Sequence, residues 1–317
     1  MVRGLFSLMT PAGARARLSI LIFHRVLATP DPLMPGEPDA ARFDQICAWL
    51  AEWFQVLSLD DAVARLRRGD LPARALAITF DDGYADNHDV AMPILQRHGL
   101  VATFYVATGF LDGGRMWNDT VIEAVRACRQ PVLDLAGLGI EGLAGLPLGD
   151  DLQRRDAIKA LLDKLKYRPS DERLALVRRV VEAVDAPLPG GVMMRSDQVK
   201  ALRRGGMTVG AHTVSHPILL KLPAAEARQE IDQSRRHLEA ILGEPVRHFA
   251  YPNGVPGRDM ADDTAALVQD LGFDSAVTTA WGAARSGSDC YQLPRFTPWD
   301  RSRLKFGARL ARNLLTT

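Results

Sequence analysis

Cysteine is scarce in this chain of 317 residues, and the three that occur, Cys47, Cys128 and Cys290, lie far apart. An odd number of widely separated cysteines argues against a disulfide framework, and the sequence contains no Cys-x-x-Cys motif that could bind zinc. A reducing compartment is therefore the simpler expectation, although exported proteins that are poor in cysteine exist.

Long apolar runs are lacking as well. No stretch approaches the ~20 residues that a membrane-spanning helix needs. The early run LSILIF is short, has arginines on both sides and is followed by no small-residue cleavage site, so it does not resemble an export signal. We expect a protein that stays in the cytoplasm or associates with a membrane from outside the bilayer.

Charge of one sign is missing at both ends, although the whole chain is balanced, with 39 basic and 38 acidic side chains. A net charge of +1 gives no indication of a nucleic-acid partner. Acidic residues are absent before Asp31 and after Asp300, where basic residues alternate with leucines. One interpretation is a basic amphipathic segment that rests weakly on anionic lipid. The favoured interpretation is a terminal helix that packs its leucines on the protein and leaves a solvated basic face.

Short apolar runs alternate with segments of helical periodicity along most of the chain. Such alternation indicates βα units and a parallel sheet, so the predicted class is α/β. The runs that we interpret as strands are 18–23, 54–59, 76–80, 102–108, 207–211, 248–252, 274–279 and 290–296.

Residues 115–195 follow a different pattern, because three helix-like stretches occur there without a strong strand signal. A Gly- and Leu-rich patch, LDLAGLGIEGLAGLPLG, joins two of them and is compatible with a short hairpin. We interpret this region as a helical insertion in a single domain that spans residues 1–317.

Polar residues follow several of the predicted strands. These residues are His24, Asp81, Asp82, His212 and Asn253. In parallel α/β barrels the active site is built at the carboxyl ends of the strands, so these side chains are expected to meet on one face.

His212 and His216 are four residues apart, and on one helical turn both imidazoles would face the same ion. Alone this spacing also fits a surface helix with two unrelated histidines. Asp82 would complete a His₂Asp set that leaves a position open for water, as in catalytic sites. Asp81 would then be the base that takes a proton from the attacking water. Two adjacent carboxylates repel each other without a cation, which favours a metal.

Three motifs in this order, ITFDDGY (78–84), HTVSHP (212–217) and FAYPNG (249–254), each follow a predicted strand. Together they resemble the polysaccharide deacetylases, the NodB-homology carbohydrate esterases. The resemblance covers about residues 20–110 and 190–298 and implies a distorted (β/α) barrel of about seven strands.

The resemblance also implies roles for single residues. Asp81 looks like the catalytic base, and Asp82, His212 and His216 look like the ligands of a divalent metal ion. Zinc is the expected ion for this ligand set, and cobalt or nickel would also suit it.

The third motif resembles the segment that supplies a backbone N–H to the oxyanion. Here that N–H belongs to Asn253, and Tyr251 and Pro252 would shape the groove. Three tryptophans are candidates for stacking on sugar rings, with core packing as an equal alternative: Trp117, Trp281 and Trp299.

The sequence departs from the family pattern twice. The arginine that usually pairs with the base is replaced by Ala250, and the nearest substitutes are Arg295 and then Arg25. No histidine follows His248, so the usual acid for the leaving amine is missing. His24 can fill that role, as in the branch that acts on β-1,6-linked poly-N-acetylglucosamine, or it can be a core histidine.

The predicted function is metal-dependent removal of N-acetyl groups from a GlcNAc-containing polysaccharide or its precursor. Two alternatives stay open at this point. The same metal site could hydrolyse an amide that is not part of a glycan, or the protein could be a weakly active glycan-binding or biosynthetic partner.

Overall fold

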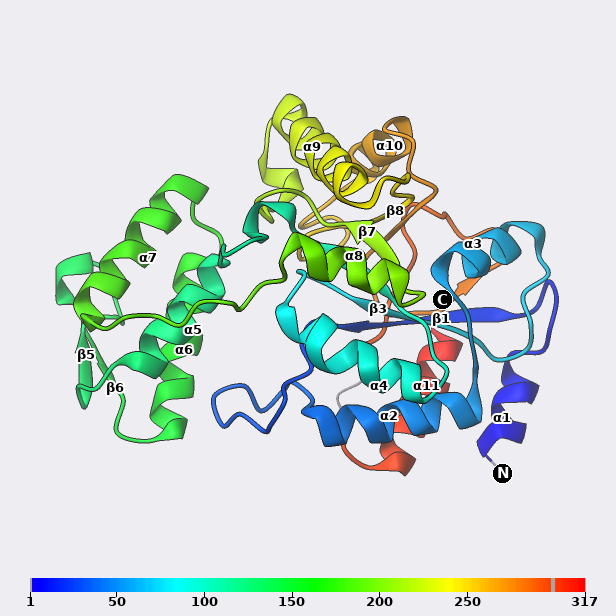
Figure 1. Ribbon diagram of the computed structural model, residues 1–317, viewed down its shortest axis with the longest axis horizontal. Coiled ribbons are helices and arrows are strands. Elements are labelled where there is room, and N and C mark those ends of the chain that lie inside the picture. Colours follow the sequence, from blue (N-terminus) through cyan, green and yellow to red (C-terminus); the bar gives the residue numbers. More distant parts are fainter. Residues whose placement is uncertain (1, 298–299, 317) are drawn as a thin grey trace. The chain divides into compact units, whose positions relative to one another are not determined.

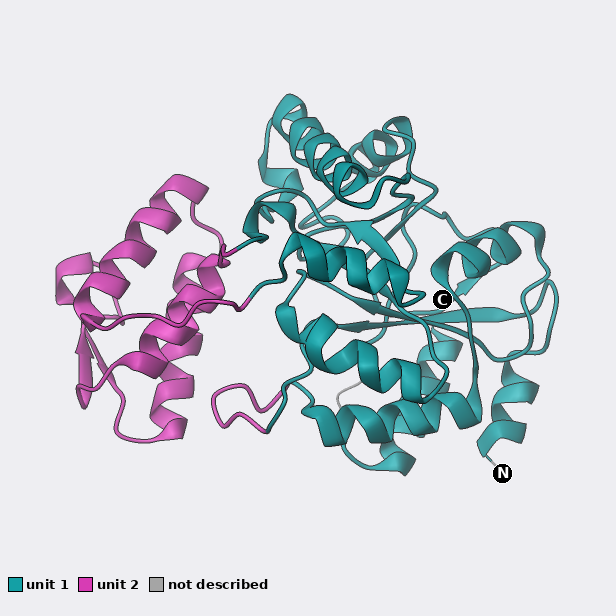
Figure 2. Ribbon diagram, viewed as in Figure 1, with its two compact units in different colours: residues 1–29, 37–112, 193–317 teal, residues 30–36, 113–192 magenta. Residues whose placement is uncertain are grey.

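The computed structural model describes residues 2–297 and 300–316. The chain forms two compact units, which Figure 2 distinguishes by colour. Unit 1 consists of residues 1–29, 37–112 and 193–317, and unit 2 consists of residues 30–36 and 113–192.

Unit 1 is built on a mostly parallel sheet with the strand order β10-β1-β3-β4-β7-β8-β9, with β2 beside β3. Among the described strands of this sheet, only β10 pairs antiparallel to its neighbour. The strands are β1 (Arg17–Phe23), β2 (Gln55–Val56), β3 (Ala75–Phe80), β4 (Thr103–Val106), β7 (Thr208–Ala211), β8 (His248–Ala250), β9 (Ser275–Val277) and β10 (Ala284–Arg285).

The segment 290–296 brings the far edge of this sheet back to β1. Leu293 bridges to Val277 of β9, and Phe296 bridges to Leu21 of β1, both in parallel orientation. Phe296 N–H donates to Ile20 at 2.8 Å and its carbonyl accepts from Ile22 at 3.0 Å. The sheet is thereby curled into a distorted barrel, as the sequence predicted, and this closing segment carries Arg295.

Helices pack around the sheet of unit 1, and Figure 1 shows α9 and α10 on one side of the strands and α2 and α4 on the other. Local sequence sets their ends: Asp39 and Ser58 cap α2 and α3, and Gly69 ends α3 in the left-handed region. The helices are α1 (Val2–Met9), α2 (Ala40–Trp53), α3 (Leu59–Arg68), α4 (Met92–Arg97), α8 (Ser196–Arg204), α9 (Ala224–Leu242), α10 (Asp262–Asp270) and α11 (Arg303–Leu315). Shorter helical turns are η1 (Asn87–Ala91), η2 (Thr108–Phe110) and η4 (Leu219–Lys221).

An aromatic column fills the core beneath the end of β3. The Phe80 ring stacks on Phe23 at 5.3 Å and on Phe104 at 4.8 Å between ring centroids, and Phe43 of α2 meets Phe80 edge-on at 5.7 Å. Phe23 and Phe80 are the last residues of β1 and β3. The residues that follow these two strands are therefore held on a rigid base.

Unit 2 has a core of its own, made of buried aliphatic side chains such as Leu161, Leu165 and Val180. It contains α5 (Trp117–Ala127), α6 (Asp151–Leu165), α7 (Ser170–Val184), the turn η3 (Ala136–Leu138) and an antiparallel pair of β5 (Val132–Asp134) and β6 (Gly145–Pro147). The three helices and the hairpin in the Gly- and Leu-rich patch are thus confirmed. That the segment is an insertion in a single domain stays a prediction.

The predicted strand 54–59 is shorter in the structure, because β2 ends at Val56 and Ser58 already caps α3. None of the helices in the described part of the chain combines the length and the apolar character that crossing a bilayer requires.

Candidate active site

Three ligand-type side chains converge at the carboxyl ends of β3 and β7. Oδ1 of Asp82 lies 3.4 Å from Nε2 of His212 and 3.4 Å from Nε2 of His216. These ligand atoms all lie within 4.8 Å of one another, and Asp82 and His212 are buried. The sequence predicted this cluster as a His₂Asp set.

The backbone that presents the two histidines differs from the expectation. They do not lie on a turn of helix: His212 follows the end of β7, and His216 lies on an irregular loop. Thr213 and His216 have φ angles of 65° and 55°, in the left-handed region that most residues avoid. The helical interpretation was wrong because contacts with other segments set the shape of this loop.

Hydrogen bonds to two other segments hold the loop. Gly109 N–H donates to the Val214 carbonyl at 2.8 Å, and a Cβ on Gly109 would lie 2.7 Å from that oxygen. The Glu230 carboxylate of α9 accepts from the N–H of Val214 and of Ser215, both at 2.9 Å, and from Ser215 Oγ at 2.7 Å. The sequence analysis missed Glu230, since an acidic residue on an amphipathic helix looks like part of a solvated face.

The second of the two adjacent aspartates has left-handed backbone as well. Asp82 has a φ of 77° and Gly83 has a φ of 87°, so the chain turns sharply after Asp81. A Cβ on Gly83 would lie 3.0 Å from Cγ1 of Val106 on β4, so both the positive φ and the tight packing favour glycine here. This turn directs Asp82 toward the histidines and Asp81 toward another partner.

The residues fit a divalent cation. Nδ1 of His212 lies 2.7 Å from the Ala250 carbonyl, and because a carbonyl oxygen only accepts, Nδ1 must be the donor. In the neutral ring the lone pair is therefore on Nε2, which faces Asp82. Oδ1 of Asp82 is buried and lacks a hydrogen-bond partner in the part of the chain that the structure describes. Imidazole nitrogens and a carboxylate oxygen are the donors that zinc accepts.

Ionisation in the cluster is consistent with cation binding. Burial lowers the pKa of His216 to about 4, which leaves its ring neutral at pH 7. Burial also opposes ionisation of Asp82, but the neighbouring His212 and the charge that His216 carries when protonated hold the pKa of Asp82 below its ordinary value. At neutral pH the cluster therefore presents an anionic oxygen next to at least one neutral imidazole.

Asp81 forms a buried bidentate ion pair with Arg295. Nη1 and Nη2 of Arg295 donate to the two carboxylate oxygens, each at 2.7 Å, and Nε donates to the Thr278 carbonyl at 2.8 Å. Although burial opposes ionisation of Asp81, the Arg295 charge lowers its pKa below the ordinary value. Arg25, the second candidate partner, lies elsewhere: its Nε donates to Asp86 at 2.8 Å.

His24 comes directly after β1, at the carboxyl ends of the strands, where Asp81 and Asp82 also lie. Its carbonyl accepts from Nδ2 of Asn87 at 2.8 Å. Burial opposes ionisation of Asp81 and of Asp82, and the charge of the His24 imidazole is one of the causes that lower the pKa of both. The His24 ring is therefore close enough to interact electrostatically with both carboxylates. Burial raises the pKa of the neighbouring Glu37, and His24 is the strongest influence opposing that rise. Sequence reasoning did not identify Glu37, which lies in a loop without a motif.

The third motif lies at the end of β8. Asn253 has a φ of 60°, and its carbonyl accepts from Thr279 Oγ1 at 2.7 Å. Its N–H donates to none of the described residues. Tyr251 is 1% exposed and its hydroxyl donates to the Tyr291 carbonyl at 2.9 Å, so this side chain supports the loop from below. Pro252 is buried as well.

The tryptophans named as sugar-stacking candidates differ in their surroundings. Trp281 is 45% exposed and meets Phe296 edge-on at 5.6 Å between ring centroids. Trp117 belongs to unit 2, where the Arg173 guanidinium lies 5.1 Å from its ring centroid. Trp299 lies outside the described residues.

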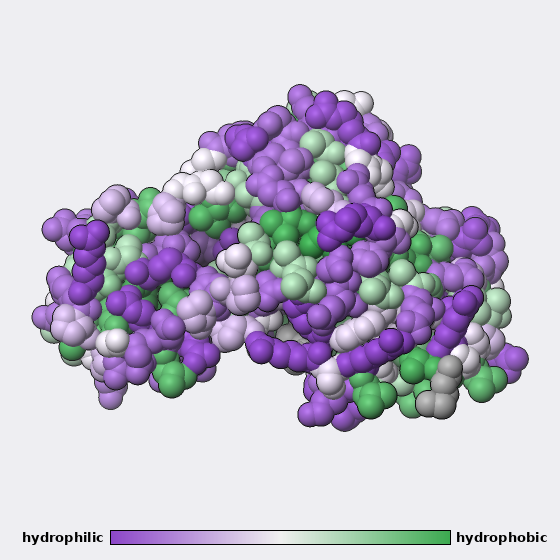
Figure 3. Space-filling model, turned by 60° about the horizontal axis from the view of Figure 1, so that its bottom comes forward, coloured by the Kyte–Doolittle hydropathy of each residue, from purple (hydrophilic) through white to green (hydrophobic). Residues whose placement is uncertain are grey.

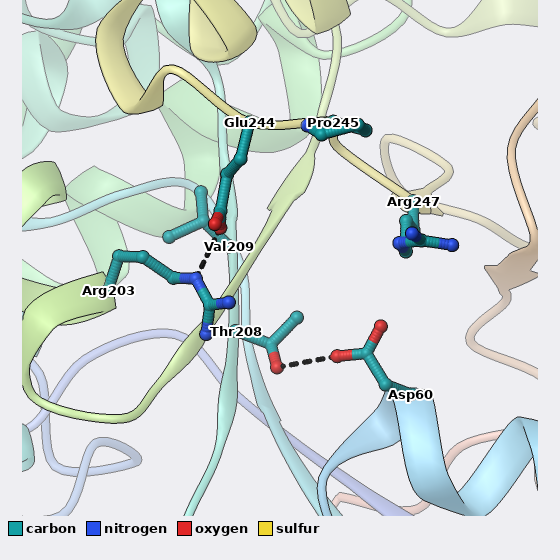
Figure 4. Close-up of a pocket in the computed structure, with 7 residues that line it drawn as sticks. All are labelled: Asp60, Arg203, Thr208, Val209, Glu244, Pro245 and Arg247. Carbon is teal, nitrogen blue, oxygen red and sulfur yellow. Dashed lines mark hydrogen bonds and ion pairs between the residues drawn. The ribbon is translucent and has the colours of Figure 1, made fainter.

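A surface pocket at the other end of β7 has a different character. Thr208, the first residue of β7, lines it together with Asp60. The charged groups there already have partners, because Arg203 pairs with Glu244 and the Thr208 hydroxyl donates to Asp60 at 3.1 Å (Figure 4). Asp60 also accepts from His248 at 3.1 Å. His212 follows the opposite end of the same strand. This pocket is therefore not part of the candidate site.

Comparison with known proteins supports the motifs. A family model described as polysaccharide deacetylase matches residues 68–130 and 152–276. A protein of Bacillus subtilis (strain 168), named putative polysaccharide deacetylase YxkH, is 31% identical over 282 residues, which cover 88% of this chain and 71% of that protein.

Solved structures of similar fold include IcaB from Ammonifex degensii, with a TM-score of 0.60 and 19% identity, over 96% of this chain and 97% of that one. The deacetylase PplD of Streptococcus pyogenes in complex with acetate gives a TM-score of 0.58 and 20% identity, over 89% of this chain and 92% of that one. At these identities the likeness shows the fold, and it confirms the distorted barrel.

Proposed function

The chain belongs to the polysaccharide deacetylase family, and from that premise we propose that it is a divalent-metal-dependent enzyme that removes N-acetyl groups from a GlcNAc-containing polysaccharide or its precursor. Membership makes it a hydrolase of carbon–nitrogen bonds in the N-acetyl groups of polysaccharides. Metal dependence and the identity of the sugar are the proposal.

One observation carries the proposal: a three-donor cluster lies next to a buried ionised carboxylate on one face of the barrel. Asp82, His212 and His216 would hold the cation, and zinc fits these donors, with cobalt or nickel as substitutes. A cation there would supply Lewis-acid activation of water and of the acetamide carbonyl.

Asp81 is our candidate for accepting a proton from the attacking water. The bidentate pair with Arg295 uses one lone pair on each carboxylate oxygen and fixes the plane of the group. A second lone pair on each oxygen stays available for the water proton. Arg295 acts through Asp81 and is a positioning residue, and it takes the role that the arginine of the third motif has in the family pattern.

His24 is the candidate for delivering a proton to the departing amine nitrogen, because it follows β1 on the face that carries Asp81 and Asp82. The Asn253 N–H, which has no partner among the described residues, is the candidate donor to the oxyanion. A backbone donor of this kind is worth about 3 kcal/mol of barrier. The exposed ring of Trp281 is a platform on which a sugar can stack.

The test is acetate release from β-1,6- and β-1,4-linked N-acetylglucosamine oligomers, measured beside O-acetylated sugars and simple acetamides. The proposal predicts release from N-acetylated oligomers and a loss of at least ~10²-fold in Asp81→Asn, the range expected for a general base. Release from simple acetamides alone would favour an amidase of another substrate class.

His24 has its own test. His24→Gln should lose most activity on oligomers and little on N-acetylated aryl amines, whose leaving group needs less help from an acid. The exposed His237, changed to Gln, is the matched control and should leave both rates unchanged. Equal losses of His24→Gln on both substrates would contradict an acid role.

A further inference from the structure

The two helices at the ends of unit 1 leave apolar side chains in solvent. The three most exposed large apolar side chains of the described residues are Leu8 on α1, at 83%, and Leu304 and Leu315 on α11, at 79% and 66%. Leu5 of α1 is 52% exposed. Single exposed leucines are ordinary, but a concentration of them on neighbouring helices calls for an explanation.

Each helix has a separate apolar side that anchors it to the core. Phe6 of α1 and Phe306 of α11 are fully buried against Trp53, with ring centroids 6.0 and 6.2 Å from it. Leu310 and Leu314 are buried on the same side of α11 as Phe306. The favoured sequence interpretation was a terminal helix that packs its leucines on the protein. It accounts for Leu310 and Leu314 and leaves the outer leucines unexplained.

The outer leucines point away from that core. At 100° per residue, Leu304 lies about 160° around the helix from Phe306, and Leu8 lies about 160° from Phe6. Leu315 comes eleven positions after Leu304, so the two side chains point within about 20° of each other around the axis of α11. A Cβ on Gly307 of α11 would lie 4.0 Å from Val2 of α1, so the two helices are in contact.

Positive charge lies beside the leucines of α11. Lys305 and Arg312 are exposed and form no ion pair with the part of the chain that the structure describes. At 100° per residue, they lie about 100° and 80° around the helix from Leu304. Neither helix carries an acidic residue. In Figure 3, which brings this underside forward, single apolar side chains stand among hydrophilic ones at the lower right.

We propose that this outer face, formed by Leu5, Leu8, Leu304 and Leu315 with Lys305 and Arg312, docks onto the surface of an anionic lipid bilayer. Leucines that enter the boundary between headgroups and acyl chains, with cations at the headgroups, are the features of interfacial membrane helices. The charge complementarity distinguishes a lipid surface from a second copy of this chain, which would present the same cations.

The experiment is flotation of the full chain with phosphatidylcholine vesicles, with and without phosphatidylglycerol. We expect flotation with the anionic vesicles, loss of it at high salt, and little with neutral ones. Lys305→Gln with Arg312→Gln should weaken partitioning by about 30-fold, at about fivefold for each cation. Leu8→Ser with Leu304→Ser should weaken it at every salt concentration.

Matched controls exist on unit 2 and on α8. Leu152→Ser with Leu174→Ser removes two exposed leucines, and Arg178→Gln with Lys200→Gln removes two exposed cations, without touching the proposed face. Both controls should float like the unchanged protein, and near-ultraviolet circular dichroism verifies that all variants are folded. No flotation with anionic vesicles, or equal losses in the controls, would overturn the proposal. A dimer in solution that Leu8→Ser with Leu304→Ser dissociates would assign the face to self-association instead.

Discussion

The buried pair of Asp81 and Arg295 permits a test that separates stability from catalysis. Asp81 is 3% exposed and Arg295 is fully buried, and two bonds of 2.7 Å join them. Removing one partner leaves the other charge buried and unpaired, which costs about 3–5 kcal/mol. Asp81→Asn and Arg295→Gln should each lower the free energy of unfolding of the metal-free protein by that amount.

The double variant, Asp81→Asn with Arg295→Gln, removes both charges together. Its loss of stability should be smaller than the sum of the single losses, by about 2 kcal/mol or more, because neither charge is then left alone. Acetate release should not recover, since the proton acceptor is still missing. Urea unfolding provides the stabilities. A coupling below about 0.5 kcal/mol, or a double variant that regains activity, would refute the reasoning.

Two further predictions concern residues that no motif marks. Burial raises the pKa of Glu37 in the folded protein, so ionisation of Glu37 destabilises the fold as the pH rises through that raised pKa. Glu37→Gln should leave the free energy of unfolding unchanged near pH 3 and raise it at pH 8. A uniform effect across that pH range would contradict the account. Glu230→Ala releases the loop that carries His216, and the zinc dissociation constant should rise about 10- to 100-fold, with Glu230→Gln in between. Glu226→Ala, exposed on the same helix, is its control, and an equal change in zinc affinity there would argue against positioning of the loop.

The sequence was informative wherever local rules decide the structure. Apolar runs located β1, β3, β4, β7, β8 and β9 within a few residues, and the strand-end position of Asp82 and His212 predicted that they meet. The pairing of Arg295 with Asp81 followed from one further step, because residues 290–296 were interpreted as a strand whose end reaches the same face of a barrel.

What the sequence did not reveal depends on contacts between distant segments. The left-handed backbone of Thr213 and His216 is held by Gly109 and Glu230, and nothing near HTVSHP indicates either residue. The two apolar sides of α11 look alike in the sequence, since periodicity does not say which of Leu304 and Leu310 meets the core. In both cases packing decides between conformations that local propensity leaves open.

The most direct test of the central claim is the metal content of the purified protein, measured together with acetate release from an N-acetylglucosamine oligomer. Metal should bind at one equivalent per chain, release should stop after chelation and return when zinc, cobalt or nickel is added, and His212→Ala and Asp82→Ala should bind no metal and release no acetate. Acetate release that survives complete removal of metal, or a protein that binds no divalent ion and responds to none, would contradict the account.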